Sequence, residues 1–344
     1  MPQFDPAVLT EGNKTFLYTG FCGNHMKDRI GAMATVLGPD MLTIEEEPVI
    51  IAPGDCYTDV TAPVVTDCPY PQDSIENWKG YKNHAFFEAP SIRKINDTYY
   101  FVFSSQVMHE LCYATSKNPV KGFKYQGVIV SNADLHIDSY KPANMPACFA
   151  ANNHGGFELI NGQYYIFYHR HTNGNWFNRQ GCAEKMKVLS DGTIPQVQIT
   201  SCGLNNGPLE GKGEYPAYIA CNIFNPDEKN FIVDIKHPRI SQDGKDGDEE
   251  PGYIANVQNG YYYGFKYFDF KNVKKISIIT RGYVYGKYEI RTKWDGPVLA
   301  EISAGCSNIW ETNSADINIP DGIGELYFKF VGNGSHQFKG FILN

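Results

Sequence analysis

The sequence predicts an all-β protein, a β-propeller followed by a β-sandwich, and three observations support this fold class. Three segments of the chain share one hairpin pattern that opens on an ionisable residue. Aromatic residues, which favour β structure, make up 14% of the 344 residues. The last third of the chain holds short strand-like segments at close spacing, which is typical of a sandwich.

The three hairpin segments have an offset of 13 residues between the ionisable lead residue and an aromatic residue of the second half. These pairs are Asp5 and Tyr18, Glu88 and Phe101, and His154 and Phe167. Asn or Gly turns lie between the halves, at Asn13, Asn96 and Gly162. A repeated hairpin with its lead residue at one fixed position predicts a ring that gathers these three residues at its axis. The alternative is three unrelated hairpins in an all-β protein.

A polar, Gly-rich segment at residues 240–251 marks a change in the chain. After it we expect strands at residues 261–270, 275–280, 286–292, 298–302 and 325–331. The sequence therefore predicts a propeller domain over residues 1–230 and a β-sandwich domain over residues 235–344. The Pro-, Asp- and Thr-rich segment 56–81 is expected to be a loop inserted between the first two hairpins.

Composition excludes several classes of function. The net charge of −8, without a basic patch, argues against a nucleic-acid partner. The longest apolar runs are too short for a membrane span. Nine scattered cysteines, without a CxxC pair, predict neither a disulfide framework nor a structural zinc site. Buried thiols in a reducing compartment are the remaining interpretation, which predicts a cytoplasmic protein.

Several motifs in order resemble the family 43 glycoside hydrolases. The motifs are FDPAV at residues 4–8, EAPSI at 88–92, NHG at 153–155, YHR at 168–170, RQGCAE at 179–184 and YPAYIACN at 215–222. The resemblance implies a five-bladed propeller that hydrolyses xylose- and arabinose-containing chains with inversion. It implies a β-xylosidase or α-L-arabinofuranosidase that acts on xylan- and arabinoxylan-derived oligosaccharides.

Inversion needs a carboxylic acid and a carboxylate on opposite faces of the sugar, roughly 6.5–9.5 Å apart. Glu88 matches the family's general acid, and its apolar neighbours are expected to raise its pKa by desolvation. Asp5 matches the Asp that orients this acid and, by its charge, disfavours its ionisation. Without the resemblance, Glu88 would be interpreted as a solvent-exposed strand end and Asp5 as an Asp-Pro turn.

The resemblance also implies residues for substrate and ion. Arg179 matches a substrate-contacting Arg, whose alternative is a surface salt bridge, and His169, Phe87 and Trp176 are further pocket candidates. His154 matches the central His that holds a calcium or sodium ion at the propeller axis, and its alternative is a structural histidine. No cofactor is expected to be required for hydrolysis.

Two departures from the family bear on activity. The family's general base is an Asp upstream of the Asp-Pro segment, and here Asp5 is the fifth residue. The sequence therefore resembles blades three to five of the ring, a truncated chain that is expected to be a poor catalyst. An alternative function is a non-catalytic carbohydrate-binding protein derived from this family, and a third is a β-repeat scaffold for protein contacts.

The C-terminal region is similar to family 6 carbohydrate-binding modules. The similarity rests on YYYGFKYFDF at residues 261–270, GKYEIR at 286–291 and GELYFKF at 324–330. Binding members end with an aromatic residue and an Asn or Asp near the sugar cleft, whereas this chain ends in HQFKGF at 336–341. We therefore expect this module to be a packed appendage that binds xylan weakly or not at all.

Overall fold

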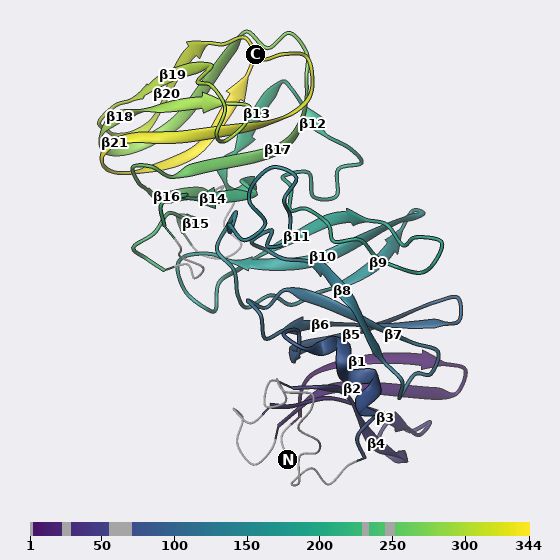
Figure 1. The fold of residues 1–344 in the computed structure, drawn as a ribbon. Helices are drawn as coiled ribbons and strands as arrows, with labels where there is room; N and C mark the ends of the chain where they lie inside the picture. Colours follow the sequence, from purple (N-terminus) through teal and green to yellow (C-terminus); the bar gives the residue numbers. More distant parts are fainter. Residues whose placement is uncertain (1–2, 23–28, 55–70, 229–233, 245–251) are drawn as a thin grey trace. The chain divides into compact units, whose positions relative to one another are not determined.

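The protein was analysed as a computed structural model, which describes residues 3–22, 29–54, 71–228, 234–244 and 252–344. In these residues strands dominate, and the helices are the short α1 (Ile75–Trp78) and two single 3₁₀ turns, Lys79–Tyr81 and Ala217–Ile219. Figure 1 shows the succession of antiparallel sheets along the chain. The predicted all-β fold class, a partial propeller followed by a β-sandwich, is confirmed.

Two compact units divide the chain. The first contains Met1–Ser131, Asn152–His169 and Lys185–Val197, and the second contains Asn132–Ala151, Arg170–Glu184 and Gln198–Asn344. Three segments upstream of residue 230 thus belong to the second unit. The predicted domain boundary at 230–235 stays a prediction, and it falls partly on residues 229–233, which lie outside the described part of the chain.

Three small antiparallel sheets follow one another in the first two-thirds of the chain. The first has the order β1 (Gln3–Glu11), β2 (Lys14–Cys22), β3 (Arg29–Leu37), β4 (Ile44–Pro53). The second has the order β5 (Phe86–Ile95), β6 (Thr98–Ser105), β7 (Leu111–Ser116), β8 (Lys124–Val130). The third has the order β11 (Arg179–Met186), β10 (Gln163–His171), β9 (Gly156–Ile160). Aromatic side chains of the first two sheets, including Tyr18, Phe86, Phe101 and Phe103, share one buried core.

The three predicted hairpins are present as β1–β2, β5–β6 and β9–β10. Each has a two-residue loop that contains a residue with positive φ: Gly12 at 60°, Asn96 at 52°, and Asn161 and Gly162 at 50° and 81°. Positive φ is the backbone conformation that tight hairpin turns require, and Asn and Gly adopt it most readily. The turn residues therefore explain why these segments fold as hairpins.

The predicted equivalence of the three lead residues does not hold for Glu88, whose register differs from that of Asp5 and His154 by two residues. Tyr18 pairs with Ala7 and Phe167 pairs with Gly156, two residues beyond Asp5 and His154. Phe101, however, pairs with Ile92, four residues beyond Glu88. The register shifts between Phe4 and Ala7, and again on both sides of Glu88. The equal offset of 13 residues therefore conceals a difference in register, which the β-bulges introduce.

The described residues of the second unit contain ten strands linked in one hydrogen-bonded sheet network that forms the β-sandwich. They are β12 (Leu209–Glu210), β13 (Gly213–Pro216), β14 (Asn222–Phe224), β15 (Arg239–Ser241), β16 (Tyr253–Val257), β17 (Tyr262–Phe270), β18 (Lys275–Arg291), β19 (Ala300–Ala304), β20 (Ser307–Asp316) and β21 (Gly322–Leu343). The segments 275–280 and 286–292 were expected to be separate strands, but they are one strand, β18. It remains continuous because it pairs with β21 over nearly its whole length.

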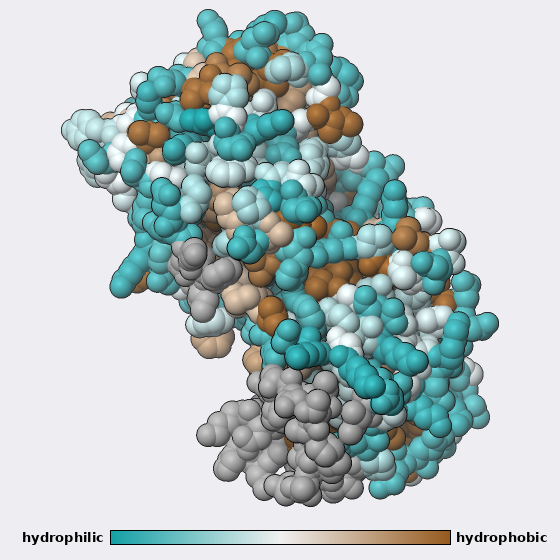
Figure 2. Space-filling view, viewed as in Figure 1, coloured by the Kyte–Doolittle hydropathy of each residue, from teal (hydrophilic) through white to brown (hydrophobic). Residues whose placement is uncertain are grey.

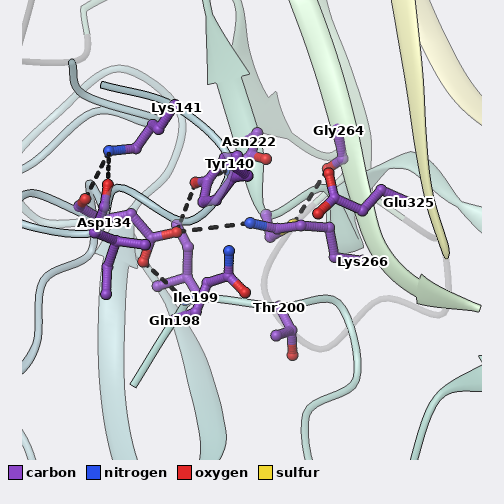
Figure 3. Close-up of polar contacts among 12 residues, drawn as sticks. Asp134, Tyr140, Lys141, Gln198, Ile199, Thr200, Asn222, Gly264, Lys266 and Glu325 are labelled. Atoms are coloured by element: carbon purple, nitrogen blue, oxygen red, sulfur yellow. Dashed lines mark hydrogen bonds and ion pairs between the residues drawn. The ribbon is translucent and has the colours of Figure 1, made fainter. Parts of the chain in front are cut away.

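A sealed polar network lies inside the second unit (Figure 3). The Asp134 and Lys266 side chains are both fully buried, with Nζ 3.6 Å from Asp134 Oδ2. Tyr140 donates a hydrogen bond to the same oxygen at 2.6 Å, and its ring centroid lies 3.6 Å from Lys266 Nζ. The Ile199 amide donates to Asp134 Oδ1 at 2.9 Å. The network joins the segment around residue 134 to strand β17 within this unit.

The segment 56–81, expected to be a loop, contains α1 near its end, and its residues 56–70 lie outside the described part of the chain. No helix among the described residues is long and apolar enough to cross a membrane. The face of the molecule in Figure 2 is mainly hydrophilic, with hydrophobic residues in separate groups.

Candidate active site

Glu88 is the centre of a cluster of ionisable side chains in the first unit. Its Oε1 lies 2.9 Å from His154 Nε2 and 3.5 Å from His109 Nδ1. The Glu88 side chain is only 13% exposed, whereas the His154 and His109 side chains are 30% and 19% exposed. The carboxylate is therefore the most buried of the three side chains, and all three keep some contact with solvent.

Asp5 joins this cluster because strand β1 lies against β5. One ligating atom each of Asp5, Glu88 and His154 lies within 4.8 Å of the others. Asp5 Oδ2 accepts a hydrogen bond from the Ala89 amide at 3.2 Å. Asp5 and Ala89 have φ of 51° and 59°, the left-handed region that marks the bulge in each strand. The bulges turn both carboxylates into the same space, so the structure brings the predicted trio together.

The electrostatics of Glu88 differ from the prediction. Burial is the largest single influence and by itself raises the pKa of this carboxyl group, as expected from its apolar neighbours. The hydrogen bonds and positive charges of His109 and His154 act in the opposite direction and outweigh burial, so the pKa of Glu88 lies well below its usual range. The expected raised pKa is wrong for this arrangement, because sequence reasoning placed His154 near the carboxylate without weighing its charge and did not foresee His109.

His169 contacts His154 and thereby supports the cluster. The His154 amide donates a hydrogen bond to His169 Nε2 at 3.2 Å, and the two rings lie 5.6 Å apart. Gly155 makes this approach possible, since a Cβ there would lie 1.9 Å from the Phe167 carbonyl oxygen. His169 therefore positions the segment that carries His154.

Arg179 lines a pocket of about 530 Å³ in the second unit. Other lining residues offer hydroxyl, amide and aromatic groups, among them Asn178, Gln180, Tyr218, Ser241 and Phe177. Arg179 is exposed, and its Nη2 donates a hydrogen bond to the Trp176 carbonyl oxygen at 3.0 Å. The wall is braced by buried Arg170, which donates to Gln180 Oε1 at 2.9 Å and to the Tyr218 carbonyl at 2.8 Å.

The two aromatic candidates have different surroundings. The Phe87 ring lies 4.4 Å from the His109 ring, so it contacts the Glu88 cluster through that histidine. Trp176 is 48% exposed and packs edge-on against His171 at 5.0 Å. Phe177, which the sequence did not single out, is 91% exposed and lines the Arg179 pocket.

Sequence reasoning missed His109 and Arg170. His109 lies outside the three hairpin patterns, in the turn between β6 and β7, and only the folded sheet brings it to Glu88. Arg170 lies within the YHR motif, but no sequence signal distinguishes a buried bracing Arg from a surface one. Met108 and His109 have positive φ values of 53° and 54°, so they lie in an unusual turn, but this backbone conformation can be recognised only in the structure.

The predicted ion at His154 stays a prediction. Two carboxylates and an imidazole within 4.8 Å are a donor set that could hold a cation. Calcium prefers six to eight oxygen ligands, so Asp5 and Glu88 would supply only a few of them and water the remainder. A cation there would supply a positive charge beside the Glu88 carboxylate.

Comparisons with known proteins identify relatives of the chain. No family model matches it. It is 59% identical over 348 residues to a xylosidase/arabinosidase from Thermoclostridium stercorarium, covering 99% of this chain and 70% of that protein. It is 24% identical over 358 residues to an arabinoxylan arabinofuranohydrolase from Paenibacillus polymyxa, covering 96% of this chain but 49% of that protein.

Among solved structures, the chain is similar to a glycoside hydrolase family 43 arabinoxylan arabinofuranohydrolase from Bacillus subtilis in complex with cellotetraose. The TM-score is 0.48 at 18% identity, covering 99% of this chain and 67% of that one. The chain thus spans from about half to about two-thirds of the length of these proteins.

Proposed function

The chain belongs to the xylosidase/arabinosidase family, the family 43 glycoside hydrolases, and we propose that it hydrolyses xylose- and arabinose-containing hemicellulose with inversion. The observation that carries this proposal is the shielded Glu88 carboxylate, with two histidines and a second carboxylate around it. The substrates are oligosaccharides derived from xylan or arabinoxylan.

Glu88 is the general acid in this proposal. It donates its proton to the glycosidic oxygen as the bond to the anomeric carbon breaks, and water attacks that carbon from the opposite face. A sugar that covers Glu88 excludes water, which raises the pKa of its carboxyl group. His154 Nε2 lies 2.9 Å from its Oε1 and is within hydrogen-bonding distance of the reacting carboxyl group.

Asp5 acts on Glu88 rather than on water. Its carboxylate is within 4.8 Å of the Glu88 cluster atoms, closer than the roughly 6.5–9.5 Å that an inverting acid and base need to admit a water. Asp5 therefore holds the Ala89 amide beside Glu88, and a different residue serves as the base.

The Arg179 pocket is proposed to bind sugar. The Arg fork and the side-chain amides match the closely spaced hydroxyl groups of a pentose, and the exposed Phe177 ring offers a flat surface for a sugar face. Arg179→Ala is then expected to raise KM more than it lowers kcat. Equal losses in both would argue against a binding role.

The test of Glu88 compares two leaving groups on the full chain. Glu88→Ala should lower kcat/KM about 10²- to 10⁴-fold on natural xylo- or arabino-oligosaccharides, which need a proton. The loss should be much smaller on dinitrophenyl glycosides, which need none. Glu158→Ala, an exposed Glu in the first unit, is the matched control. Equal losses on both substrates would contradict the role of general acid.

A second candidate function, sugar binding without catalysis, is favoured by a pocket of about 590 Å³ on the sandwich. Arg281 and Tyr283 line it, and Tyr285 follows on the same face of β18, with Tyr283 74% and Tyr285 80% exposed. Arg281 is held by Asp243 at 2.6 Å and lies 4.2 Å from the Trp310 ring centroid. Fixed, exposed aromatic and guanidinium groups are typical of sugar platforms.

Affinity electrophoresis in arabinoxylan tests this platform. Retardation that Tyr283→Ala abolishes and Ile323→Ala retains would support it, since Ile323 is a comparably exposed side chain of the same unit. That result would overturn the expectation of weak binding, which rested on the C-terminal sequence HQFKGF. His336 and Gln337 of that sequence line the same pocket. Binding without turnover on any oligosaccharide would favour the non-catalytic function for the whole chain.

A further inference from the structure

We propose that His84, Glu110 and Cys112 form a site for a thiophilic divalent transition metal of the zinc class. One ligating atom of each lies within 4.8 Å of the other two. His84 lies just before β5, Glu110 just before β7, and Cys112 within β7. Glu110 and Cys112 are two residues apart, so their side chains lie on the same side of the strand. All three belong to the first unit.

The donor set is the chemical argument for this metal class. Zinc takes imidazole, carboxylate and thiolate ligands, and sites with three protein ligands leave one position for water. Zinc bonds of about 2.0–2.3 Å place tetrahedral ligand atoms roughly 3.3–3.8 Å apart. His84 Nδ1 and Glu110 Oε1, now 2.7 Å apart, would therefore have to separate slightly, and the three ligand atoms already lie within 4.8 Å of one another.

Burial makes the cluster unusual. Glu110 and Cys112 are both completely buried. An acid and a thiol side by side in a low-dielectric interior repel each other when both are ionised, and a divalent cation removes that repulsion by binding both anions. The ordinary alternative is a His84–Glu110 pair beside a neutral thiol, without a metal.

The site has an entry path and a fixed geometry. The His84 side chain is 24% exposed, so an ion can reach it from solvent. Its ring stacks on Tyr125 at 5.0 Å, and the Tyr125 hydroxyl lies 3.8 Å from Cys112 Sγ. Tyr125 therefore contacts both the His84 imidazole and the Cys112 sulfur and keeps them close to each other.

The position suggests a structural purpose for the ion. Glu110 directly follows His109, whose Nδ1 lies 3.5 Å from Glu88 Oε1. Met108 and His109 both have positive φ, a turn conformation that non-glycine residues adopt at a cost. A metal bound to Glu110 would anchor the end of this turn and thereby keep His109 at the Glu88 cluster.

Cobalt titration of the chelator-treated full chain tests the site. Co²⁺ bound to a thiolate gives a charge-transfer absorption, which we expect to saturate at one ion per chain and to disappear when Zn²⁺ is added. Cys112→Ser should abolish the band, and Cys148→Ser, another buried cysteine, should retain it. His154→Ala should also retain the band, which separates this site from the cluster of Asp5, Glu88 and His154.

Glu110→Gln covers the case in which the serine variant fails to fold. It keeps the shape and an acceptor for His84 but removes the negative charge. We expect it to weaken Co²⁺ binding about 100-fold or more and to lose the rise in Tm that Zn²⁺ gives the wild type. The proposal is overturned if the wild type shows no charge-transfer band, if the band survives in Cys112→Ser, or if folded Glu110→Gln binds Co²⁺ as tightly as the wild type.

Discussion

Two clusters of charged side chains, one in each unit, pair a carboxylate with cations in different ways. Glu88 faces His154 and His109, whose side chains are 30% and 19% exposed. Asp134 faces Lys266, and both are fully buried, with the Tyr140 ring against the ammonium group (Figure 3). Protons can reach the first cluster from solvent, whereas the second is sealed. The first is therefore suited to proton transfer, and the second to holding the fold.

The largest effect is expected from the open cluster. Glu88→Gln should lower kcat/KM on oligosaccharides by about 10²- to 10⁴-fold. Its cost to the free energy of unfolding should be at most about 1–2 kcal/mol, because the histidines left behind remain partly hydrated. Initial rates and urea denaturation measure the two quantities. A stability loss with unchanged activity would reverse the roles assigned to the clusters.

The sealed cluster should show the opposite behaviour. Asp134→Asn leaves the Lys266 ammonium buried without its counter-charge, which should cost about 3–5 kcal/mol of unfolding free energy. The folded fraction should keep its kcat/KM. Asp138→Asn, at an exposed position nearby in the chain, should change stability by less than about 0.5 kcal/mol. A loss below about 1 kcal/mol for Asp134→Asn would mean that the pair contributes little to the fold.

The buried His336 side chain should make the stability of the protein depend on pH. Burial lowers the pKa of this histidine to about 4, and the Tyr288 hydroxyl lies 2.6 Å from its Nε2. The unfolded chain takes up the proton near pH 6.5 and the folded chain only near pH 4, so stability falls as the pH drops between these values. The loss should approach about 3 kcal/mol.

His336→Gln should remove that part of the pH dependence. Urea denaturation at pH 7.0 and pH 4.5 gives the change in the free energy of unfolding between these pH values, and this change is compared between the wild type and the variant. If the free energy of unfolding changes equally in the two proteins, His336 is protonated in the folded protein at pH 4.5.

The smallest effect is expected from an exposed pair. Arg93 Nε lies 3.1 Å from Glu158 Oε2, and both side chains are about half exposed. A double-mutant cycle with Arg93→Ala and Glu158→Ala should give a coupling energy between 0 and about 1 kcal/mol that disappears in high salt. A coupling energy of about 3 kcal/mol or more, as large as the loss expected for Asp134→Asn, would show that burial does not distinguish the pairs.

Local patterns predicted the elements of the fold well. Alternating aromatic strands with Asn or Gly between them predicted the three hairpins, and the short apolar segments after residue 260 predicted the sandwich strands. The prediction failed where pairing with a distant strand sets the length of an element. Strand β18 stays continuous across residues 281–285 because β21 pairs with it there. Asp5, Glu88 and His154 lie together, as predicted, whereas their place at a propeller axis and their catalytic roles stay predictions.

The sequence by itself determined the family, the β-rich architecture and the ionisable residues that open each hairpin, because these follow from local propensity and motif order. Only the tertiary structure decided how those residues interact. The bulges set the register of Asp5 and Glu88, and the β6–β7 turn brought His109 to the carboxylate. These contacts reversed the direction in which burial alone shifts the pKa of Glu88. Such effects depend on distances of a few ångströms between residues far apart in the chain, which no local pattern encodes.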